Sequence, residues 1–234
     1  MLPTIFMLTL SLLPAHWSGT LPTTGLTSLR IDNPLGKVTV IAAEDGIISA
    51  EAEVTGYDAI KDTPWFKSAK IELTADGKMG LLKLDIDEQF SLTDPPHINF
   101  TVKVPRDLVC NINAVLDDVV IKGTEVAYTV SLVNGNISVT APRTLGSYEC
   151  VNGSITIDAT EPLTSGMLIA RAVDGDVSIH LPKGSIANYD TDTINGTITL
   201  PAAATASVAT ENKTSIVAQT INGNITIVEV EPLK

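Results

Sequence analysis

Apolar residues recur at every second position along most of this chain, which is the spacing of half-buried β-strands and not that of helices. Ile48 to Val54 alternates with Ser, Glu and Thr, and Ile98 to Val104 alternates in the same way before Pro105. The rhythm stops between Tyr57 and Phe66, where a short helix or a loop is predicted. These patterns predict an all-β protein.

Turn signals divide the strands of the N-terminal part. Asn33-Pro34-Leu35-Gly36 separates two short apolar runs. Ala75-Asp76-Gly77-Lys78 is a hairpin signal between alternating segments at 70–74 and 82–87. The N-terminal part is therefore predicted to be more sheet-like and partly antiparallel.

A seven-residue phrase recurs five times in the C-terminal half: an aliphatic residue, Asn or Asp, Gly, any residue, Ile or Val, Ser or Thr, and a second aliphatic residue. Successive glycines of the phrase are 18, 22, 21 and 27 residues apart. The segment Val115 to Ile121 resembles an earlier copy in which Asp118 replaces the glycine. The turn residues of the five copies are Asn134-Gly135, Asn152-Gly153, Asp174-Gly175, Asn195-Gly196 and Asn222-Gly223.

A period near 20 residues, with a strand after each turn, indicates β-structure stacked turn on turn. Asn-Gly and Asp-Gly accept positive φ, so we expect them to turn the chain at each corner. We predict a β-solenoid or β-roll of stacked coils of about 20 residues, whose neighbouring coils bury one another's Ile and Val columns. The N-terminal sheet and the tail Glu229 to Lys234 are expected to cap its ends, and the 27-residue spacing indicates an insertion or an irregular coil.

The same alternation places a column of Ser and Thr on the outside of the solenoid. One interpretation is a flat polar binding face, and the other is that Ser and Thr are simply good outward residues of strands. An ice-binding threonine array is disfavoured because Ser138, Asp176 and several asparagines interrupt it. The turn residues Asn134, Asn152, Asn195 and Asn222 are expected to stack as an amide ladder, which Asp174 makes less than strict. The candidate binding face consists of Ser138, Thr156, Asp176, Ser178, Thr197, Thr199 and Thr226.

The chain begins with an apolar segment, MLPTIFMLTLSLLPAHW, which is shorter than the ~20 residues of a membrane helix. A signal peptide cleaved near Ala15 or Gly19 is the main interpretation, and an uncleaved anchor or a misassigned start codon are the alternatives. We predict a mature chain without a transmembrane helix, located outside the cytoplasm (secreted, periplasmic or at the cell surface). The predicted organisation is a leader at 1–22, an N-terminal β-strand region at 23–106 continuous with the solenoid, and the repeat solenoid at 107–234.

Composition narrows the function classes. With 27 acidic and 15 basic residues the net charge is −12, which argues against nucleic acid as a partner because little could neutralise its phosphates. Aromatic residues make up 4% of the chain, which suits a thin aliphatic core better than an aromatic-lined carbohydrate cleft. Cys110 and Cys150 lack metal-ligand spacing, so they are either two buried thiols or one disulfide.

No group of residues in the sequence indicates a reaction. His97 and His180 are not at a metal-ligand spacing, and the carboxylates have structural interpretations as turn caps, repeat turns or solvated loop residues. A calcium ion held by Asp174, Asp176 and Asp190 is a minor alternative. We therefore expect no enzyme activity, no cofactor and no metal. The carboxylate pairs considered are Asp117-Asp118, Asp174/Asp176 and Asp190/Asp192.

The succession Ile31 to Val40, then Ile98 to Val104 with Pro105 and Leu108, then the Asn-Gly-x-Ile-Ser/Thr-Val copies, resembles the "putative adhesin" family of bacterial and archaeal β-strand-repeat proteins. The resemblance covers about residues 27–230 and implies a β-solenoid at the cell envelope, with no catalytic residues to carry over. We expect an exported, non-enzymatic, adhesin-like protein that binds or scaffolds through a solenoid face. Its expected partners are a cell-wall polymer, a glycan or an envelope protein. A polymer-forming solenoid of the bactofilin type is the alternative, and a carbohydrate-active enzyme is less favoured.

Overall fold

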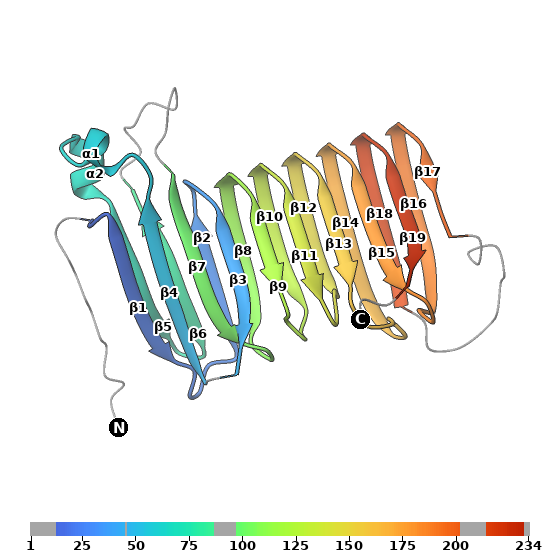
Figure 1. Cartoon of the computed structure of the whole chain (residues 1–234), viewed down its shortest axis with the longest axis horizontal. Coiled ribbons are helices and arrows are strands. Elements are labelled where there is room, and N and C mark those ends of the chain that lie inside the picture. Colours follow the sequence, from blue (N-terminus) through green and yellow to red (C-terminus); the bar gives the residue numbers. More distant parts are fainter. Residues whose placement is uncertain (1–12, 45, 87–96, 202–213, 232–234) are drawn as a thin grey trace.

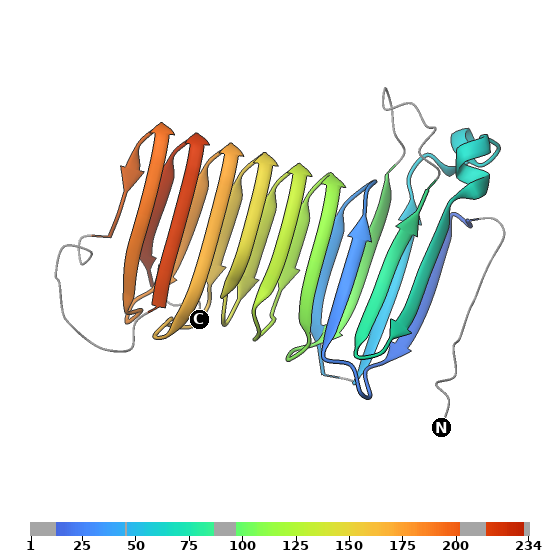
Figure 2. The same cartoon turned by 180° about the vertical axis from the view of Figure 1, so that it is seen from behind.

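The computed structural model describes residues 13–44, 46–86, 97–201 and 214–231. Two mixed β-sheets lie against one another along the long axis of the molecule (Figures 1 and 2). Two short helices, α1 (Tyr57–Ile60) and α2 (Pro64–Ser68), lie at one end. The predicted all-β class is confirmed, and the helices occupy the segment in which the alternation stops.

The described residues form 10 strands in the first sheet, sheet A, and 9 in the second, sheet B. From the helical end, sheet A consists of β1 (His16–Pro22), β4 (Ile47–Val54), β7 (Ile98–Pro105), β3 (Val38–Ala43), β9 (Val119–Lys122), β11 (Ile137–Ala141), β13 (Ile155–Ala159), β15 (Val177–Pro182), β19 (Ile225–Val230) and β17 (Ile198–Thr199). Sheet B consists of β5 (Lys70–Asp76), β6 (Met79–Asp85), β2 (Ser28–Asn33), β8 (Val109–Leu116), β10 (Tyr128–Asn134), β12 (Gly146–Asn152), β14 (Gly166–Asp174), β18 (Thr214–Asn222) and β16 (Ala187–Asn195).

From β8 to β15 the chain alternates strictly between the two sheets. We call two such consecutive strands a unit, so that β8/β9 and β10/β11 are neighbouring units. Each strand pairs in parallel with the equivalent strand of the next unit, as Tyr128 does with Cys110 and Ile137 with Val119. The repeated phrase lies where the chain passes from sheet B to sheet A, at the upper edge in Figure 1.

Sequence order and spatial order differ at both ends of the sheets. Unit β18/β19 lies between β14/β15 and β16/β17, so the last two copies of the phrase exchange places. The wide spacing between Gly196 and Gly223 therefore spans the return from the terminal unit to the inner one, and its residues 202–213 lie outside the described part. At the helical end, unit β2/β3 likewise lies between β6/β7 and β8/β9.

Antiparallel strands lie at the helical end, as the sequence predicts for the N-terminal part. β4 pairs antiparallel with both β7 and β1, and β5 pairs antiparallel with β6. Strand β1 comes from residues inside the predicted leader, of which 1–12 lie outside the described part. Cleavage near Ala15 would leave β1 whole, whereas cleavage near Gly19 would divide it.

The first residues of the tail that was expected to cap the other end lie within sheet A instead. Glu229 and Val230 belong to β19, which lies inside the sheet between β15 and β17. Residues 232–234 lie outside the described part. The terminal unit is β16/β17, and its Ile198, expected in the core, is 42% exposed because β17 is the last strand of sheet A.

Inward side chains of both sheets form one aliphatic core. In sheet A, Val139, Ile157 and Ile179 lie in register across three units and are at most 1% exposed. Sheet B contributes Tyr128 and Tyr148, which are the largest wholly buried side chains. The predicted columns of stacked aliphatic residues are therefore present wherever a unit has neighbours on both sides.

Glycine is required at the corners mainly because the units approach closely. A Cβ on Gly153 would lie 1.8 Å from the carbonyl oxygen of Gly135 in the preceding unit. A similar clash occurs at all five corners, whereas φ lies in the left-handed range only at Gly135, Gly153 and Gly175. The prediction that positive φ explains the glycines is therefore wrong for Gly196 and Gly223.

Asp117, and not Asp118, occupies the glycine position in unit β8/β9. Leu116 pairs with Asn134, which places Asp117 opposite Gly135. Asp117 is also the one non-glycine residue with positive φ in the described part of the chain, at 68°. The sequence-based assignment is off by one residue, since Asp118 instead accepts a hydrogen bond from the backbone N–H of Asn136 at 2.8 Å.

Candidate binding surface

The outer face of sheet B carries a row of exposed aliphatic side chains, one from each of six neighbouring strands. Each is the residue before the corner, and the register aligns them, since Asn134 pairs with both Leu116 and Asn152. Their exposed fractions range from 37% to 72%. We call this set the aliphatic row; in order along the sheet it consists of Val115, Val133, Val151, Val173, Ile221 and Ile194.

The aliphatic row is the feature that the sequence analysis missed. In β10, Leu132 is buried and Val133, the next residue, points outward, so two apolar residues stand side by side before the corner. The first aliphatic residue of the repeated phrase is this outward residue. Strict alternation within the strand identifies it as outward, because the residue before it is buried.

A second row of outward side chains runs parallel to the aliphatic row, two residues earlier in each strand. At its centre the Arg171 guanidinium donates to Glu149 Oε1 at 3.3 Å and to Gln219 Oε1 at 2.9 Å. The Arg171 and Glu149 side chains remain 45% and 51% exposed, so this ion pair contributes little stability. We call this set the polar row; from β8 to β16 it consists of Asn113, Ser131, Glu149, Arg171, Gln219 and Asp192.

The two rows line an open groove of about 820 Å³ that crosses the strands. Asp32, Asn33 and Pro34 of the neighbouring unit contribute to its lining beyond β8. Figure 2 shows this face from the front, with the helices at its end and no described segment across the strands from β8 to β16. The groove therefore offers a continuous apolar stripe beside hydrogen-bonding groups, which is the usual composition of a binding site.

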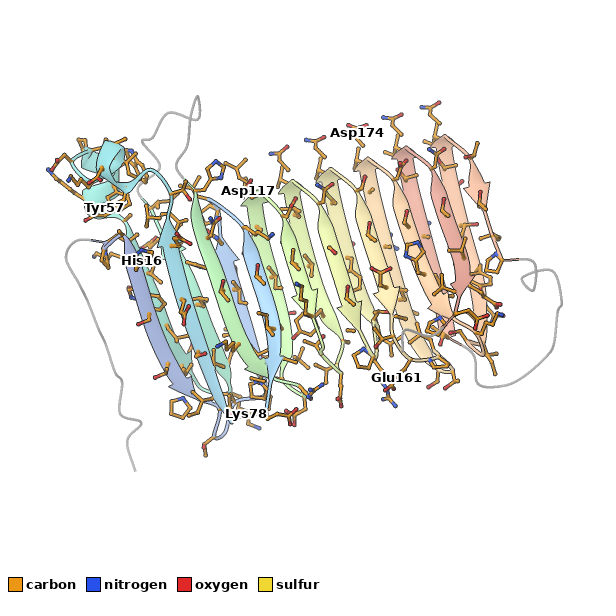
Figure 3. The ribbon with its side chains drawn as sticks, in the orientation of Figure 1. His16, Tyr57, Lys78, Asp117, Glu161 and Asp174 are labelled. Carbon is orange, nitrogen blue, oxygen red and sulfur yellow. The ribbon has the colours of Figure 1, made fainter. Side chains whose placement is uncertain are left out.

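An amide ladder borders the groove along the corner edge, near the Asp174 label in Figure 3. Asn152 Nδ2 donates to Asn134 Oδ1 at 2.8 Å, Asn222 Nδ2 donates to Asp174 Oδ1 at 2.5 Å, and Asn195 Nδ2 donates to Asn222 Oδ1 at 2.8 Å. The predicted stacking of the turn asparagines is present. Asp174 accepts from Asn222, but its carboxylate has no N–H to donate to Asn152, so the ladder is not strict at this position, as expected.

Five residues of the candidate face chosen from the sequence lie together on the outer face of sheet A. The register places them opposite one another in neighbouring strands, and all except Thr199, which is exposed, are half-buried. They form a polar row on sheet A, and the two views show that this sheet lies on the side of the molecule opposite sheet B and its groove (Figures 1 and 2). These residues are Ser138, Thr156, Ser178, Thr226 and Thr199.

Asp176 and Thr197, the other two residues of that candidate face, lie at the corners. Asp176 Oδ1 accepts from the backbone N–H of Asn224 at 2.7 Å, and Thr197 Oγ1 donates to Asn224 Oδ1 at 2.8 Å. Asn136 and Ser154 make the same kind of bond to the backbone N–H of the next unit. Their side chains therefore connect neighbouring units.

The ionisable residues considered for chemistry are spread over the molecule. His97 Nδ1 is hydrogen-bonded to Asp117, and His180 Nδ1 lies 2.5 Å from Asp158 Oδ1 on sheet A. Asp174 and Asp190 lie on β14 and β16, which β18 separates, and Asp190 is five residues from the corner. The proposed calcium ligands are thus not brought together. Within the described ranges no group of three or more His, Cys, Asp or Glu residues is arranged to hold a metal.

The two cysteines are free thiols. Cys110 lies on β8 and Cys150 on β12, with β10 between them, so they are too far apart for a disulfide. Burial raises the pKa of the Cys110 thiol to about 12, and burial also raises the pKa of Cys150. Both thiols are therefore core residues of low reactivity.

Comparison with solved structures supports the fold. A "putative cell adhesion protein" from Clostridium sporogenes matches over 92% of this chain and 99% of its own, with a TM-score of 0.50 and 11% identity. A "putative adhesin" from Bacteroides fragilis matches over 92% and 97% of the two chains, with a TM-score of 0.40 and 13% identity. One from Parabacteroides merdae matches over 93% and 97%, with a TM-score of 0.36 and 10% identity.

At such low identity the similarity concerns the fold alone. Of these three structures, the one from Clostridium sporogenes has the TM-score that supports a shared fold. No protein-family model and no curated protein matches the sequence. In the described part of the chain no helix has the length and apolar character needed to cross a membrane.

Proposed function

We propose that this chain is a non-enzymatic, adhesin-like β-solenoid of the cell envelope and that it binds its partner through the groove of sheet B. The observation that carries the proposal is the aliphatic row. Six aligned aliphatic side chains facing solvent are costly to leave in water, and contiguous exposed apolar patches in soluble proteins mark interaction sites.

The alternation of strands between the sheets supports the solenoid part of the proposal. Parallel pairing of equivalent strands, the stacked corner glycines and the side-chain ladders repeat from unit to unit. Export rests on the apolar leader, and the name of the Clostridium structure agrees with an envelope role. Expected partners remain a cell-wall polymer, a glycan or an envelope protein.

The two ends of the sheets favour binding over polymerisation, the alternative function. A filament of stacked coils needs two open ends with parallel edges of matching form. Here the last strands at one end, β1 and β5, pair antiparallel with their neighbours, whereas β16 and β17 at the other end pair in parallel, so the ends do not match. At the parallel end, the edge strand β16 carries Asp190 and Asp192, and charged residues on edge strands oppose pairing with another chain.

The experiment is a co-sedimentation assay of the purified chain with isolated cell envelopes. The variant Val151→Asp with Val173→Asp places two carboxylates in the aliphatic row and is expected to weaken binding at least tenfold. The matched control, Thr156→Asp with Ser178→Asp, makes the same change in the same two units on sheet A and is expected to bind normally. Melting temperatures of both variants show whether folding is intact.

The outcomes separate the two faces. Loss of binding only in the sheet A variant would move the site to the Ser and Thr row. Unchanged binding in both variants would contradict a role for either face. Recovery of the chain with Met1 intact in the cytosol would contradict the export part of the proposal.

A further inference from the structure

The polar row of sheet B is self-complementary when its order is reversed. Its centre lies between Glu149 on β12 and Arg171 on β14, which have opposite charges. One strand further out on either side lie Ser131 and Gln219, and two strands further out lie Asn113 and Asp192. Reversing the row therefore places Ser131 opposite Gln219 and Asn113 opposite Asp192. Each of the three pairs joins groups that can hydrogen-bond or form an ion pair.

A two-fold axis produces this matching physically. If two copies pack through the outer faces of sheet B, with the axis parallel to the strands and between β12 and β14, each row meets its own reversed copy. Glu149 then faces the partner's Arg171, and Val151 faces the partner's Val173. The polar row packs on the polar row, and the aliphatic row packs on the aliphatic row.

The charges favour this register over its neighbours. The chain has a net charge of −12, so two copies repel one another overall unless opposite charges face each other at the contact. An axis placed on β12 would put Glu149 opposite the partner's Glu149, and an axis on β14 would put Arg171 opposite the partner's Arg171. With the axis between these strands no carboxylate of the polar row faces another, because Asp192 meets the partner's Asn113.

The size of the face suits a weak, reversible dimer. Six strands spaced about 4.8 Å apart span roughly 24 Å, and seven residues of strand cover about 23 Å. The face is thus on the order of 550 Å² per copy, or about 1,100 Å² in total, which is at the lower end of specific interfaces. Dissociation constants in the micromolar range are expected for such an interface.

We propose that the groove of sheet B binds a second copy of this chain in a face-to-face, two-fold symmetric dimer centred between β12 and β14. This inference rests on the proposed function, because it uses the same groove and names its partner. Two cells that each display the protein would then be held together by identical surfaces, as in homophilic adhesion.

Sedimentation velocity of the chain recovered from cells tests the proposal. The concentrations should run from about 1 to several hundred micromolar, a range that brackets the expected dissociation constant. We expect a concentration-dependent shift to twice the monomer mass. E149R alone and R171E alone should each weaken self-association at least tenfold, because each puts like charges opposite one another. Lys122→Glu, a charge reversal on sheet A, is the control and should leave the dimer unchanged.

Mixing the two variants provides the decisive measurement. In a mixture of E149R and R171E the facing charges are complementary again, so a heterodimer should form, and the double variant E149R/R171E should self-associate like the wild type. Mixing does not change the sequence of either chain. If association returns in the mixture, the cause is therefore the contact between the two chains and not improved folding of either one. Failure of the mixture to associate, while the wild type dimerises, would overturn the two-fold register.

Envelope binding separates this inference from the proposed function. A wild-type chain that stays monomeric yet binds envelopes through the aliphatic row would overturn the dimer and leave the proposed function standing. If the chain binds envelopes from cells that lack the protein as tightly as envelopes that carry it, a second copy of the chain is not the partner. Dimerisation together with binding only to envelopes that carry the protein would support the inference.

Discussion

Gly153 lies directly against Gly135 of the preceding unit, so close that a Cβ on Gly153 would be 1.8 Å from the Gly135 carbonyl oxygen. The backbone N–H of Gly153 donates at the same corner to the carbonyl of Asp174, at 2.8 Å. The corner glycines therefore form a stack in which each backbone fills the space that a side chain would need. Their role is to let successive units approach to the strand spacing of a sheet.

Gly153→Ala is expected to destabilise the protein by about 1–3 kcal/mol, because the new methyl group overlaps backbone that cannot rotate away. Gly46→Ala is the control, since the nearest atom to its Cβ would be 3.6 Å away and its φ is not in the left-handed range. Urea denaturation measures both changes in the free energy of unfolding. Equal effects of the two substitutions would contradict the steric role of the corner stack.

Asn222→Asp is expected to destabilise the corner ladder by about 1 kcal/mol. It removes the Nδ2 donor to Asp174 and places two carboxylates at hydrogen-bond distance. The cost should shrink in an Asp174→Asn background, where no like charge remains, and in 1 M salt, where exposed charges are screened. A double-mutant cycle of the two positions measures this coupling, and additive effects would mean that the side chains do not interact.

Stability is expected to fall above about pH 9. Burial raises the pKa of Cys110 from 9.0 to about 12, so the folded protein keeps the thiol proton that the unfolded chain loses. The contribution of the neutral thiol is complete below pH 9 and is lost as the pH rises towards 12, at about 1.4 kcal/mol per pH unit. Burial also raises the pKa of Tyr128 and Tyr148, which extends the loss above about pH 10.

Urea midpoints measured between pH 8 and pH 11 test this titration. The variant Cys110→Val removes the thiol while keeping a small apolar side chain, and its stability should fall less steeply between pH 9 and pH 10. The Cys110 thiol should also fail to react with a thiol reagent until the protein unfolds. A wild-type midpoint that does not change over this range would be incompatible with the buried, protonated thiol.

Hydrogen exchange should distinguish β16 from β18. β18 pairs with strands on both sides, whereas β16 pairs only with β18 among the described strands. In a parallel strand alternate N–H groups point to opposite sides, so every second amide of β16 lacks a ladder partner. We expect these amides to exchange at least tenfold faster than those of β18 in an NMR measurement. Uniform protection along β16 would show that its edge is covered.

The candidate groove could have been predicted from the sequence only in part. Val133 and Val151 each follow a buried residue of the same strand, so alternation along the strand predicts that they point outward. The polar row does not follow in the same way, because Arg171 meets Gln219 only if β14 and β18 are neighbours. Sequence order instead suggests that β14 lies beside β16.

Local sequence patterns specify the repeating unit: the strand period, the corner after each Asn-Gly or Asp-Gly, the inward aliphatic residues and the amide ladder. These depend on interactions within a few residues or between identical positions of any two copies. The order of the units was decided by the tertiary structure, because the copies at Asn195 and Asn222 have the same local pattern and could each pair with β14.

Burial distinguishes these two copies. β18 carries no charge, buries Ile216 and Ala218, and lies where both of its edges are paired. β16 carries Asp190 and Asp192 and takes the open edge, where carboxylates stay hydrated. The hydrogen bond from Arg171 to Gln219 and the order of Ile221 and Ile194 in the aliphatic row depend on that choice, which rests on the free energy of burying one strand and leaving the other at the surface.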